Sequence, residues 1–443
     1  MSFTTYTEAL AYFYSYTNFN PANFDPSGSL ERLRTLLARL DDPHKRFPSL
    51  LIAGTKGKGS TAAICESILR QAGYKTGLYI SPHLHSFRER IRLSGALISE
   101  EQVIALANRL KPYFETTPGL SAFELITVLA FITFAEAQID VAVLEVGLGG
   151  RLDATNAVDP TVAVITPISY DHTHILGETL TLIAREKAGI IRPGALVISA
   201  PQVDEAMQMI EAVCQKNQAR LIVVDRDWKW QMNPSDLSGE SFTICGQTYK
   251  LPLIGQHQVV NAVTALAALT GFAERTGFDL PPEAIRQGIA EVEWLGRMEI
   301  LQQQPYLIID SAMNGDSAQK LALTLGHYFP GKKFVFIYGA SSDHPIRDML
   351  TALLPMAHKM MMVQSRHPRA ANANNLVAMA ADLGYQTEAM PDVPAALTKA
   401  LAEATSDVVI CVTGSLFLAA DVREAWLRHH HLPLPPIDPL MTS

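Results

Sequence analysis

Cysteine is scarce in this chain of 443 residues, which contains only Cys65, Cys214, Cys245 and Cys411. The four positions are far apart and include no Cys-x-x-Cys pair and no spacing typical of zinc ligands. Such a pattern predicts neither a disulfide framework nor a zinc site. We therefore expect each cysteine to be a small, buried apolar residue in a protein from a reducing compartment.

Basic charge and long apolar runs are also lacking. The chain has 36 Lys and Arg against 44 Asp and Glu, and its net charge of −8 argues against a general nucleic-acid surface. No uninterrupted apolar run approaches the roughly 20 residues that span a bilayer. The N-terminal sequence Met1-Ser-Phe-Thr-Thr-Tyr-Thr-Glu has neither the basic stretch nor the apolar core of a secretory signal. We expect a cytoplasmic protein that binds neither nucleic acid nor membranes.

The composition is otherwise that of a globular protein, with 48% hydrophobic and 18% charged residues. A chain of this length predicts two or three domains. In its first part, short apolar runs alternate with segments of helical periodicity. The expected strands are 49–53, 76–80, 141–146, 161–165, 195–199 and 221–224, and the expected helices are 60–72, 100–111, 122–137, 180–188 and 204–216. This alternation predicts an α/β fold with a mainly parallel sheet covered by helices on both faces.

A second alternating pattern follows Trp294-Leu-Gly-Arg297. Its expected strands are 306–310, 334–338, 359–363 and 408–412, and its expected helices are 317–328, 371–383, 393–403 and 416–428. We expect a smaller α/β domain over 297–443 after a first domain over 1–296. The stretch 225–252 is poor in helix signals and predicts a β-rich excursion of the first domain. The histidines 429–431 precede a proline-rich tail, and we interpret them as solvated rather than metal-binding.

The segment Leu51-Ile-Ala-Gly-Thr-Lys-Gly-Lys-Gly-Ser60-Thr61 is the most informative motif. An apolar strand runs into a glycine-rich turn and then into a helix, which places backbone N–H groups, a helix N-terminus and the Lys58 ammonium around one anion. The hydroxyls of Ser60 and Thr61 follow where a phosphate-bound Mg²⁺ can be reached. The spacing differs from the usual P-loop, with two residues instead of four between Gly54 and the Gly57-Lys58 pair. A tight turn without a ligand is the alternative.

Polar residues follow other expected strands at the edge where ligands bind in such sheets. Glu145 ends a buried strand, so its carboxylate needs a cation, a donor or a metal; a salt bridge to Arg151 is the alternative. Asp171-His172 follows the next strand, and a structural histidine is the alternative there. A carboxylate, an imidazole and hydroxyls together suit Mg²⁺ with ATP.

For two expected helices, residue spacing alone does not decide whether the polar side chains have a functional role. Lys187, with Gly189 as the helix cap, is typical of a lysine that neutralises the helix dipole. His257 and Asn261 lie four residues apart on one helix face. That face is either an ordinary exposed one or a site of adenine recognition through the Asn amide.

Taken together, these motifs resemble the Mur ligase superfamily and, more closely, the folylpolyglutamate synthase/dihydrofolate synthase family. The resemblance covers nearly the whole chain in the right order. It includes Asp42-Pro-His-Lys-Arg-Phe-Pro, 54–60, Ser81-Pro82, Glu89-Arg90-Ile91, Phe123-Glu124, 145–156, Asp171-His172, 186–190, 255–261, Arg297-Met-Glu299 and Val412-Thr-Gly-Ser415.

The resemblance implies an ATP-dependent amide ligase. Such enzymes activate a carboxylate as an acyl phosphate and let an amino acid's amine attack it, here joining L-glutamate to dihydropteroate, to folates, or to both. It also implies a P-loop-type ATPase domain, which also binds the pterin, followed by a Rossmann-like amino-acid-binding domain. The expected ligands are ATP, two Mg²⁺ ions, small-molecule substrates and K⁺ as a further candidate, and the expected working unit is a monomer.

The resemblance also assigns residues. Nucleotide positions are Gly54, Thr55, Gly57, Lys58, Gly59, Ser60, Thr61, Asn261, Arg297 and Asp310, and magnesium positions are Ser60, Ser81, Glu145, His172 and Lys187. Substrate positions are Arg90, Phe123, Asn314 and Ser415, and the catalytic set is Lys58, Lys187, His172 and Arg297. Lys187 matches a lysine carried as a carbamate, which replaces the dipole interpretation above.

The chain departs from the family mainly on the amino-acid side. Lys56 stands where the phosphate loop usually has Asn, Met313 replaces a histidine, and His344 stands where a lysine is usual. Three hypotheses follow: an ordinary glutamate ligase, a divergent paralogue that joins a different acid or amino acid, and a folate- or nucleotide-binding protein with little ligase activity. A pure binder does not need the two-metal positions, which argues against the third.

Overall fold

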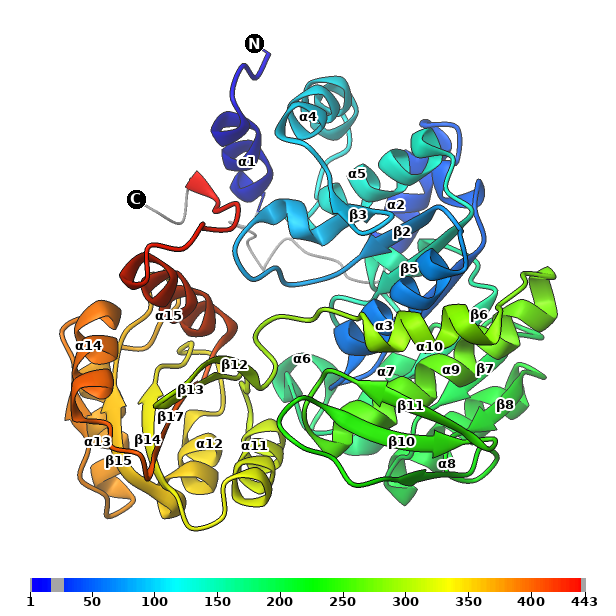
Figure 1. The fold of residues 1–443 in the computed structure, drawn as a ribbon. Helices are drawn as coiled ribbons and strands as arrows, with labels where there is room; N and C mark the ends of the chain where they lie inside the picture. Colours follow the sequence, from blue (N-terminus) through cyan, green and yellow to red (C-terminus); the bar gives the residue numbers. More distant parts are fainter. Residues whose placement is uncertain (1, 17–27, 440–443) are drawn as a thin grey trace. The chain divides into compact units, whose positions relative to one another are not determined.

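The structure is a computed structural model, and it describes residues 2–16 and 28–439. These residues form two compact units (Figure 1). The first contains the residues up to 233 together with 241–251 and 258–292, and the second contains 234–240, 252–257 and the residues from 293 onward. The units therefore interleave, and their main division lies at 292/293.

The first unit is built on an eight-stranded sheet. Its order is β4 (Ala96–Leu97), β3 (Ile91–Leu93), β2 (Thr76–Tyr79), β5 (Val141–Glu145), β1 (Ser49–Ala53), β6 (Val162–Ile165), β7 (Leu196–Ser199) and β8 (Arg220–Val223). Strands β2, β5, β1, β6, β7 and β8 pair in parallel, whereas the β2–β3 and β3–β4 pairs are antiparallel. Strands β1, β2, β5, β6 and β7 are buried along their whole length, which explains their near-continuous apolar sequences. The predicted parallel sheet is confirmed.

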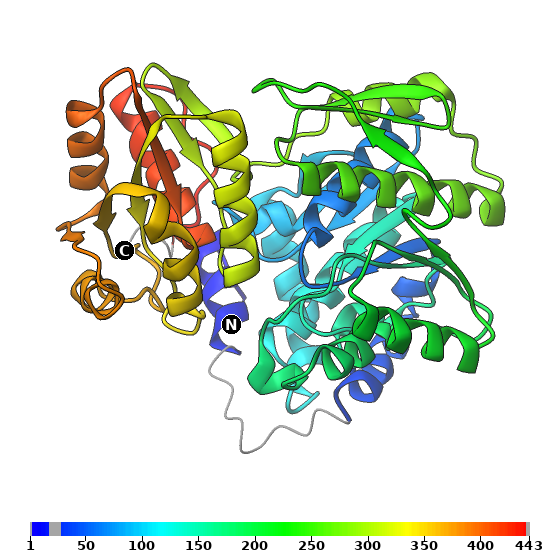
Figure 2. The ribbon, with the colours of Figure 1, turned by 90° about the horizontal axis from the view of Figure 1, so that it is seen from below.

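Helices cover both faces of this sheet (Figure 2). The helices of the unit are α1 (Tyr6–Ser15), α2 (Ser29–Ala38), α3 (Lys58–Gln71), α4 (Glu100–Glu115), α5 (Ala122–Ala137), α6 (Thr173–Leu176), α7 (Leu180–Ala188), α8 (Asp204–Lys216), α9 (Gln256–Thr276) and α10 (Pro282–Ala290), with short 3₁₀ turns η3 (Pro43–Lys45), η4 (Phe87–Arg90) and η5 (Ala154–Ala157). Helices α4 and α5 each begin with a capping box, Ser99 with Gln102 and Ser121 with Glu124. Helix α5 is apolar on all sides because it is buried nearly all round. No helix of the described residues combines the length and apolarity of a membrane span.

A three-stranded antiparallel sheet confirms the predicted β-rich excursion. Its order is β11 (Gln247–Leu251), β10 (Glu240–Ile244) and β9 (Trp230–Met232). The hairpin between β10 and β11 turns at Cys245-Gly246, where φ is 49° and 74°. The expectation that all cysteines are buried is wrong for Cys245, which is exposed because it occupies this turn; the other three are buried.

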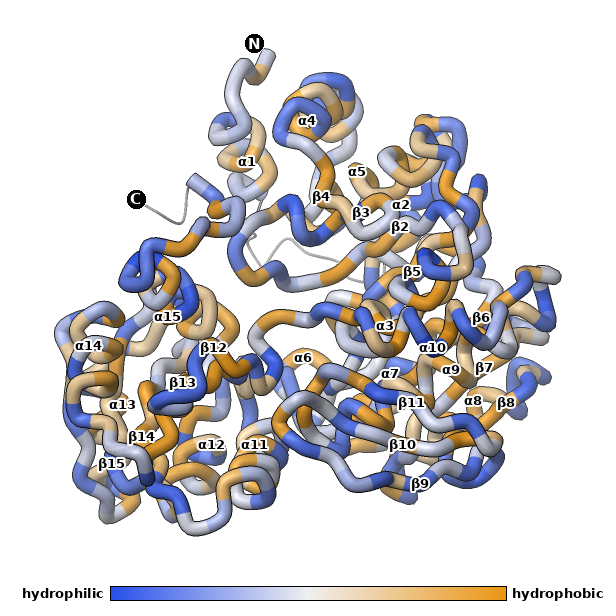
Figure 3. The backbone as a smooth tube through the Cα atoms, viewed as in Figure 1, coloured by the Kyte–Doolittle hydropathy of each residue, from blue (hydrophilic) through white to orange (hydrophobic). Residues whose placement is uncertain are grey.

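The second unit has a six-stranded sheet. Its order is β12 (Glu299–Gln303), β13 (Tyr306–Ile309), β17 (Val408–Thr413), β14 (Lys333–Tyr338), β15 (Ala357–Met362) and β16 (Glu388–Ala389), and only β12 is antiparallel. Its helices are α11 (Gly315–Tyr328), α12 (Ile346–Leu353), α13 (Ala373–Asp382), α14 (Val393–Glu403) and α15 (Leu416–His429), with a 3₁₀ turn η6 (Leu354–Met356). Strand β14 is largely hydrophobic (Figure 3), and its Phe334, Phe336 and Tyr338 are part of the core of this unit. The predicted smaller α/β unit is confirmed.

Candidate active site

The phosphate loop joins β1 to α3 in a conformation that only glycine fits. Gly54 has a φ of 144°, and a Cβ at this position would lie 1.8 Å from Oγ1 of Thr166. The backbone N–H groups of Thr55 and Lys56 both donate to the carbonyl oxygen of Pro167, at 3.0 and 3.1 Å. These two amides are already used, so an anion would be bound by the first amides of α3, which have no acceptor within the helix.

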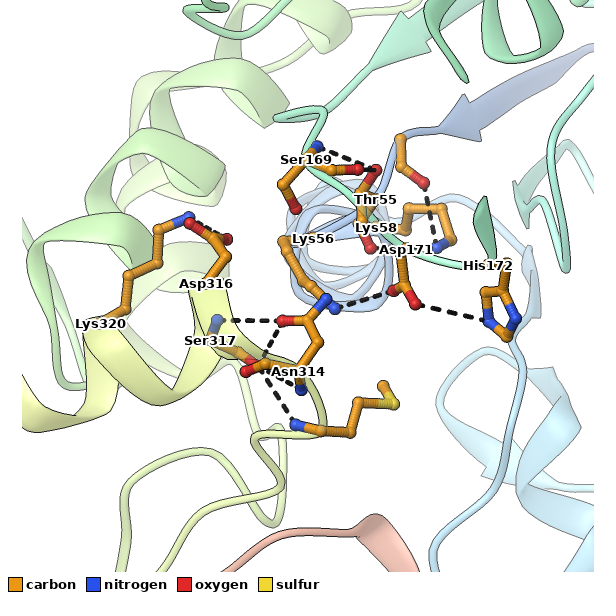
Figure 4. A network of polar contacts seen from close by, with 12 residues as sticks. Thr55, Lys56, Lys58, Ser169, Asp171, His172, Asn314, Asp316, Ser317 and Lys320 are labelled. Atoms are coloured by element: carbon orange, nitrogen blue, oxygen red, sulfur yellow. Dashed lines mark hydrogen bonds and ion pairs between the residues drawn. The ribbon is translucent and has the colours of Figure 1, made fainter. Parts of the chain in front are cut away.

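Lys56, Lys58 and Lys187 make polar contacts at this loop, and the first two are labelled in Figure 4. Lys58 Nζ lies 3.2 Å and Lys187 Nζ lies 2.8 Å from the same acceptor, the carbonyl oxygen of Gly54. Lys56 forms an ion pair with Asp171, whose Oδ2 is 3.0 Å from Nζ. Lys58 therefore brings positive charge to the loop, as a site for phosphates needs, while Asp171 offsets the charge of Lys56.

Lys187 is buried although it lies in the last turn of α7. Its side chain points at the phosphate loop, not at solvent, which excludes the simple dipole interpretation of a lysine at an exposed helix end. Burial, together with the nearby charge of Lys58, lowers the pKa of Lys187 to about 7. A large fraction of this amine is therefore neutral near pH 7.

Glu145 ends β5 and is buried, as expected. Its Oε2 accepts a hydrogen bond from the backbone N–H of Ser81 at 3.0 Å, so two of the expected magnesium positions lie together. The alternative salt bridge to Arg151 is wrong, because Arg151 pairs with Glu186 at 3.0 Å. A buried strand-end carboxylate with a hydroxyl residue beside it fits a hard divalent cation.

His172 lies at the start of the short helix α6, with a φ of 48°. Its Nε2 is 3.7 Å from Oδ1 of Asp171, so the Lys56–Asp171 pair borders the imidazole. Among the described residues, no three His, Cys, Asp or Glu side chains gather as a ready-made metal site. The donors expected from the resemblance are instead two hydroxyls, one carboxylate, one imidazole and a modified lysine.

Phe123, an expected substrate position, lies next to Gly147, two residues after Glu145. A Cβ on Gly147 would lie 2.5 Å from Cζ of Phe123, and the ring of Phe123 is 6.0 Å from that of Tyr79. Asp153 is buried nearby and accepts hydrogen bonds from the backbone of Leu148 and from Thr155, while burial raises its pKa. The sequence analysis did not single out Tyr79 or Asp153, although Asp153 belongs to the 145–156 motif.

Asn261 is buried against the phosphate loop. Its Nδ2 donates to Oε1 of Gln258 at 2.9 Å, and its Oδ1 lies 2.1 Å from where a Cβ of Gly57 would be. The alternative that this is an ordinary exposed helix face is therefore wrong for Asn261. Gln258, buried as well, was missed because glutamine in a helix is most often a surface residue.

The expected residues of the second unit lie after β13 and β17. Asp310 accepts hydrogen bonds from the backbone N–H groups of Met298 and Ala312, at 3.0 and 2.9 Å. Burial raises the pKa of Asp310, against the opposing charge of Arg297. Ser415 caps α15 by accepting from Leu418 N at 3.1 Å.

Asn314 and Met313 form the start of α11. Asn314 Oδ1 accepts from Ser317 N at 3.0 Å, and Met313 N donates to Oγ of Ser317 at 3.1 Å (Figure 4). Asn314 therefore serves as a helix cap in this structure. Met313 is half-buried. His344, the other residue that differs from the family pattern, follows Asp343, which forms an ion pair with Arg369 at 2.8 Å.

These features define a Mur ligase. Residues 52–269 match the Mur ligase middle domain, and residues 296–416 match the Mur ligase glutamate ligase domain. A dihydrofolate synthase/folylpolyglutamate synthase from Bacillus subtilis is 33% identical over 95% of this chain and 99% of its own length.

Solved structures of proteins with related names are also similar to this chain. Escherichia coli FolC in complex with DHPP and ADP is 33% identical, with a TM-score of 0.84 over 95% of this chain and 98% of the other. A bifunctional folylpolyglutamate synthase/dihydrofolate synthase from Yersinia pestis, complexed with AMPPNP and Mn ion, is 32% identical with a TM-score of 0.83, over 97% and 98% of the two chains. The chain belongs to the dihydrofolate synthase/folylpolyglutamate synthase family, and the prediction of an ATP-dependent ligase is confirmed.

Proposed function

We propose that this chain joins L-glutamate to dihydropteroate, to folates, or to both, at the expense of ATP. One observation supports the proposal beyond family membership: the Lys58 ammonium and the Lys187 side-chain nitrogen both lie on the Gly54 carbonyl, in front of the N-terminus of α3. Positive charge and helix-end amides are thus concentrated where a triphosphate would bind.

In the proposed reaction, a carboxylate oxygen of the acid attacks the γ-phosphorus of ATP, and ADP leaves. The amine of glutamate then attacks the acyl carbon, inorganic phosphate leaves, and the nitrogen loses a proton. Lys58 would offset the charge that develops on the phosphoryl group. By their match to the family, Arg297 would act at the γ-phosphate, and Asn261 and Asp310 would bind the nucleoside.

The magnesium positions would be Ser60, Ser81, Glu145, His172 and Lys187. Bound magnesium would neutralise the phosphate oxygens. With its pKa near 7, the neutral Lys187 amine can attack CO₂, so that a nitrogen–carbon bond forms, a proton is released, and the resulting carbamate offers an oxygen ligand. The proposed enzyme uses two Mg²⁺ ions, has K⁺ as a further candidate ligand, and works as a monomer.

Mass analysis of reaction products tests the proposal. The protein is mixed with ATP, Mg²⁺, dihydropteroate or tetrahydrofolate, and a pool of amino acids. A gain of one glutamyl unit on the pteroate is the expected result, and gains on tetrahydrofolate would add polyglutamate activity. Attachment of a different amino acid would support the divergent paralogue and direct attention to Met313 and His344. No product with either acid would contradict the proposed function.

A further inference from the structure

Arg90, the last residue of η4, has no carboxylate partner within the described part of the chain. Among residues 2–16 and 28–439, no Asp or Glu oxygen lies within ion-pair distance of its guanidinium, and its terminal nitrogens donate no hydrogen bond. The nearby Arg88 differs, because it lies 3.7 Å from the carboxylate of Glu100. A half-buried guanidinium with open terminal nitrogens favours an anionic ligand.

Arg90 lies at the edge of the sheet that carries the candidate site. Its carbonyl oxygen accepts from the backbone N–H of Ile80 at 3.0 Å, directly beyond the end of β2. The next residue, Ser81, is bound to Glu145, and the preceding Tyr79 faces Phe123. Any anion held by Arg90 would therefore be close to the expected metal and pterin positions.

One side chain fixes the orientation of Arg90. Its Nε donates to Nδ1 of His83 at 2.8 Å. Arginine Nε is always a donor, so Nδ1 of His83 must be the acceptor. His83 is only 4% exposed, and the carboxylate of Glu89 holds its loop by accepting from three consecutive backbone N–H groups, those of residues 84–86, at 2.8 to 2.9 Å.

We propose that His83 is a positioning residue that orients the Arg90 guanidinium toward the carboxylate of the acid substrate. The Nε–Nδ1 hydrogen bond fixes the plane of the guanidinium and leaves both terminal nitrogens for a bidentate contact with a carboxylate. The assignment rests on the proposed function, which supplies a substrate acid, and extends it to a residue that does not touch the substrate.

Replacing His83 by asparagine or by glutamine distinguishes an orienting hydrogen bond from a purely packing role, because each amide mimics one of the two ring nitrogens. His83→Asn keeps an acceptor near the position of Nδ1, whereas His83→Gln places its amide near Nε2 and loses that acceptor. We expect His83→Gln to raise the KM for dihydropteroate about tenfold, with the KM for ATP within about twofold of wild type. His83→Asn should recover most of this loss. Arg88→Lys, which changes an arginine with its own ion pair, is the control and should alter neither KM.

A double-mutant cycle completes the test. Arg90→Lys keeps the charge but lacks the Nε donor, so it should raise the KM for dihydropteroate by itself, and His83→Gln should add little to it. Equal KM values for His83→Gln and wild type, full additivity, or equal losses in His83→Gln and His83→Asn would each overturn the assignment. If His83→Gln fails to fold, an unchanged KM in Arg90→Lys overturns it equally. Absence of any ligated product with the wild-type protein would instead overturn the proposed function, and this assignment with it.

Discussion

At the scale of single residues, the charge state of Lys187 has a measurable effect on stability. Burial holds its pKa at about 7 in the folded protein, below the ordinary value of 10.5. Between these two pH values the unfolded chain binds more protons than the folded one, so this lysine destabilises the fold, and the effect fades as the pH rises. Below pH 7 the destabilisation is fully present.

We therefore expect Lys187→Met to be more stable than wild type at pH 7, by an amount on the order of a few kcal/mol. The advantage should shrink by about 1.4 kcal/mol for each pH unit between 7 and 10. Urea unfolding of both proteins in buffers free of CO₂ measures this difference. A stability difference that does not vary with pH would show that Lys187 does not change its protonation on folding in this range.

Met313 permits a second test at the residue scale. Its backbone is fixed by the hydrogen bond to Ser317, so a histidine side chain would leave from the same point and add a donor for a carboxylate. We expect Met313→His to lower the KM for glutamate several-fold, by about one hydrogen bond to a charged group. Steady-state kinetics at varied glutamate measures this, with the exposed Met379→His as control. An unchanged KM would mean that position 313 does not determine amino-acid binding.

At the scale of elements, the turn between β1 and α3 depends on its glycines. Gly54→Ala would place a Cβ 1.8 Å from Thr166 Oγ1 in a backbone conformation that side chains rarely adopt. The loop must then shift, and the α3 amides would lose their place at the phosphate.

We expect Gly54→Ala to weaken ADP binding at least about tenfold and to destabilise the protein by about 1–3 kcal/mol. Gly73→Ala is the matched control, because Gly73 also has a positive φ, 89°, but its Cβ would meet nothing within 4 Å. That variant should lose about 1 kcal/mol of stability and keep its ADP affinity. Isothermal titration with ADP and thermal unfolding distinguish the two. Tight ADP binding by Gly54→Ala would contradict the proposed role of this turn.

Several long helices and the buried strands could be predicted from the sequence, whereas the shortest strands could not. The expected helices 122–137, 180–188 and 204–216 agree with α5, α7 and α8 residue for residue. Strands β4 and β16 have two residues each, too few for a hydrophobic period to register.

Sequence spacing also predicted only part of the candidate site. Spacing alone indicated a dipole-neutralising Lys187 and left Asn261 open between an exposed face and adenine recognition, because only the packing of α7 and α9 buries these side chains. His83 gave no signal, because its role depends on a partner seven residues away.

At the scale of the whole molecule, the two units are joined near exposed residues. Leu295 is 44% exposed and follows the main division at 292/293. If ligand binding draws the two units together, the linker between them becomes less accessible.

We expect ATP together with dihydropteroate to slow chymotrypsin cleavage near residues 294–300 several-fold relative to the free protein. Gel electrophoresis and mass analysis of the fragments over time measure this, and cleavage at a site remote from the linker serves as the control. Equal rates with and without ligands would argue against a mobile linker at this position.

The interleaving of the two units also restricts where this chain can be recombined with a homologous chain. Residues 234–240 and 252–257 belong to the second unit, and Glu240 there accepts hydrogen bonds from Gly255 N at 2.6 Å and from the Tyr328 hydroxyl at 2.7 Å. A chimera with a relative, recombined once at 292/293, would bring Tyr328 from one parent and Glu240 from the other. Because Glu240 is buried, a parent without a donor at position 328 would leave that carboxylate short of a partner. Exchange of the ligase half should therefore cost least stability where a parent that supplies Glu240 is joined to one that keeps a donor at position 328.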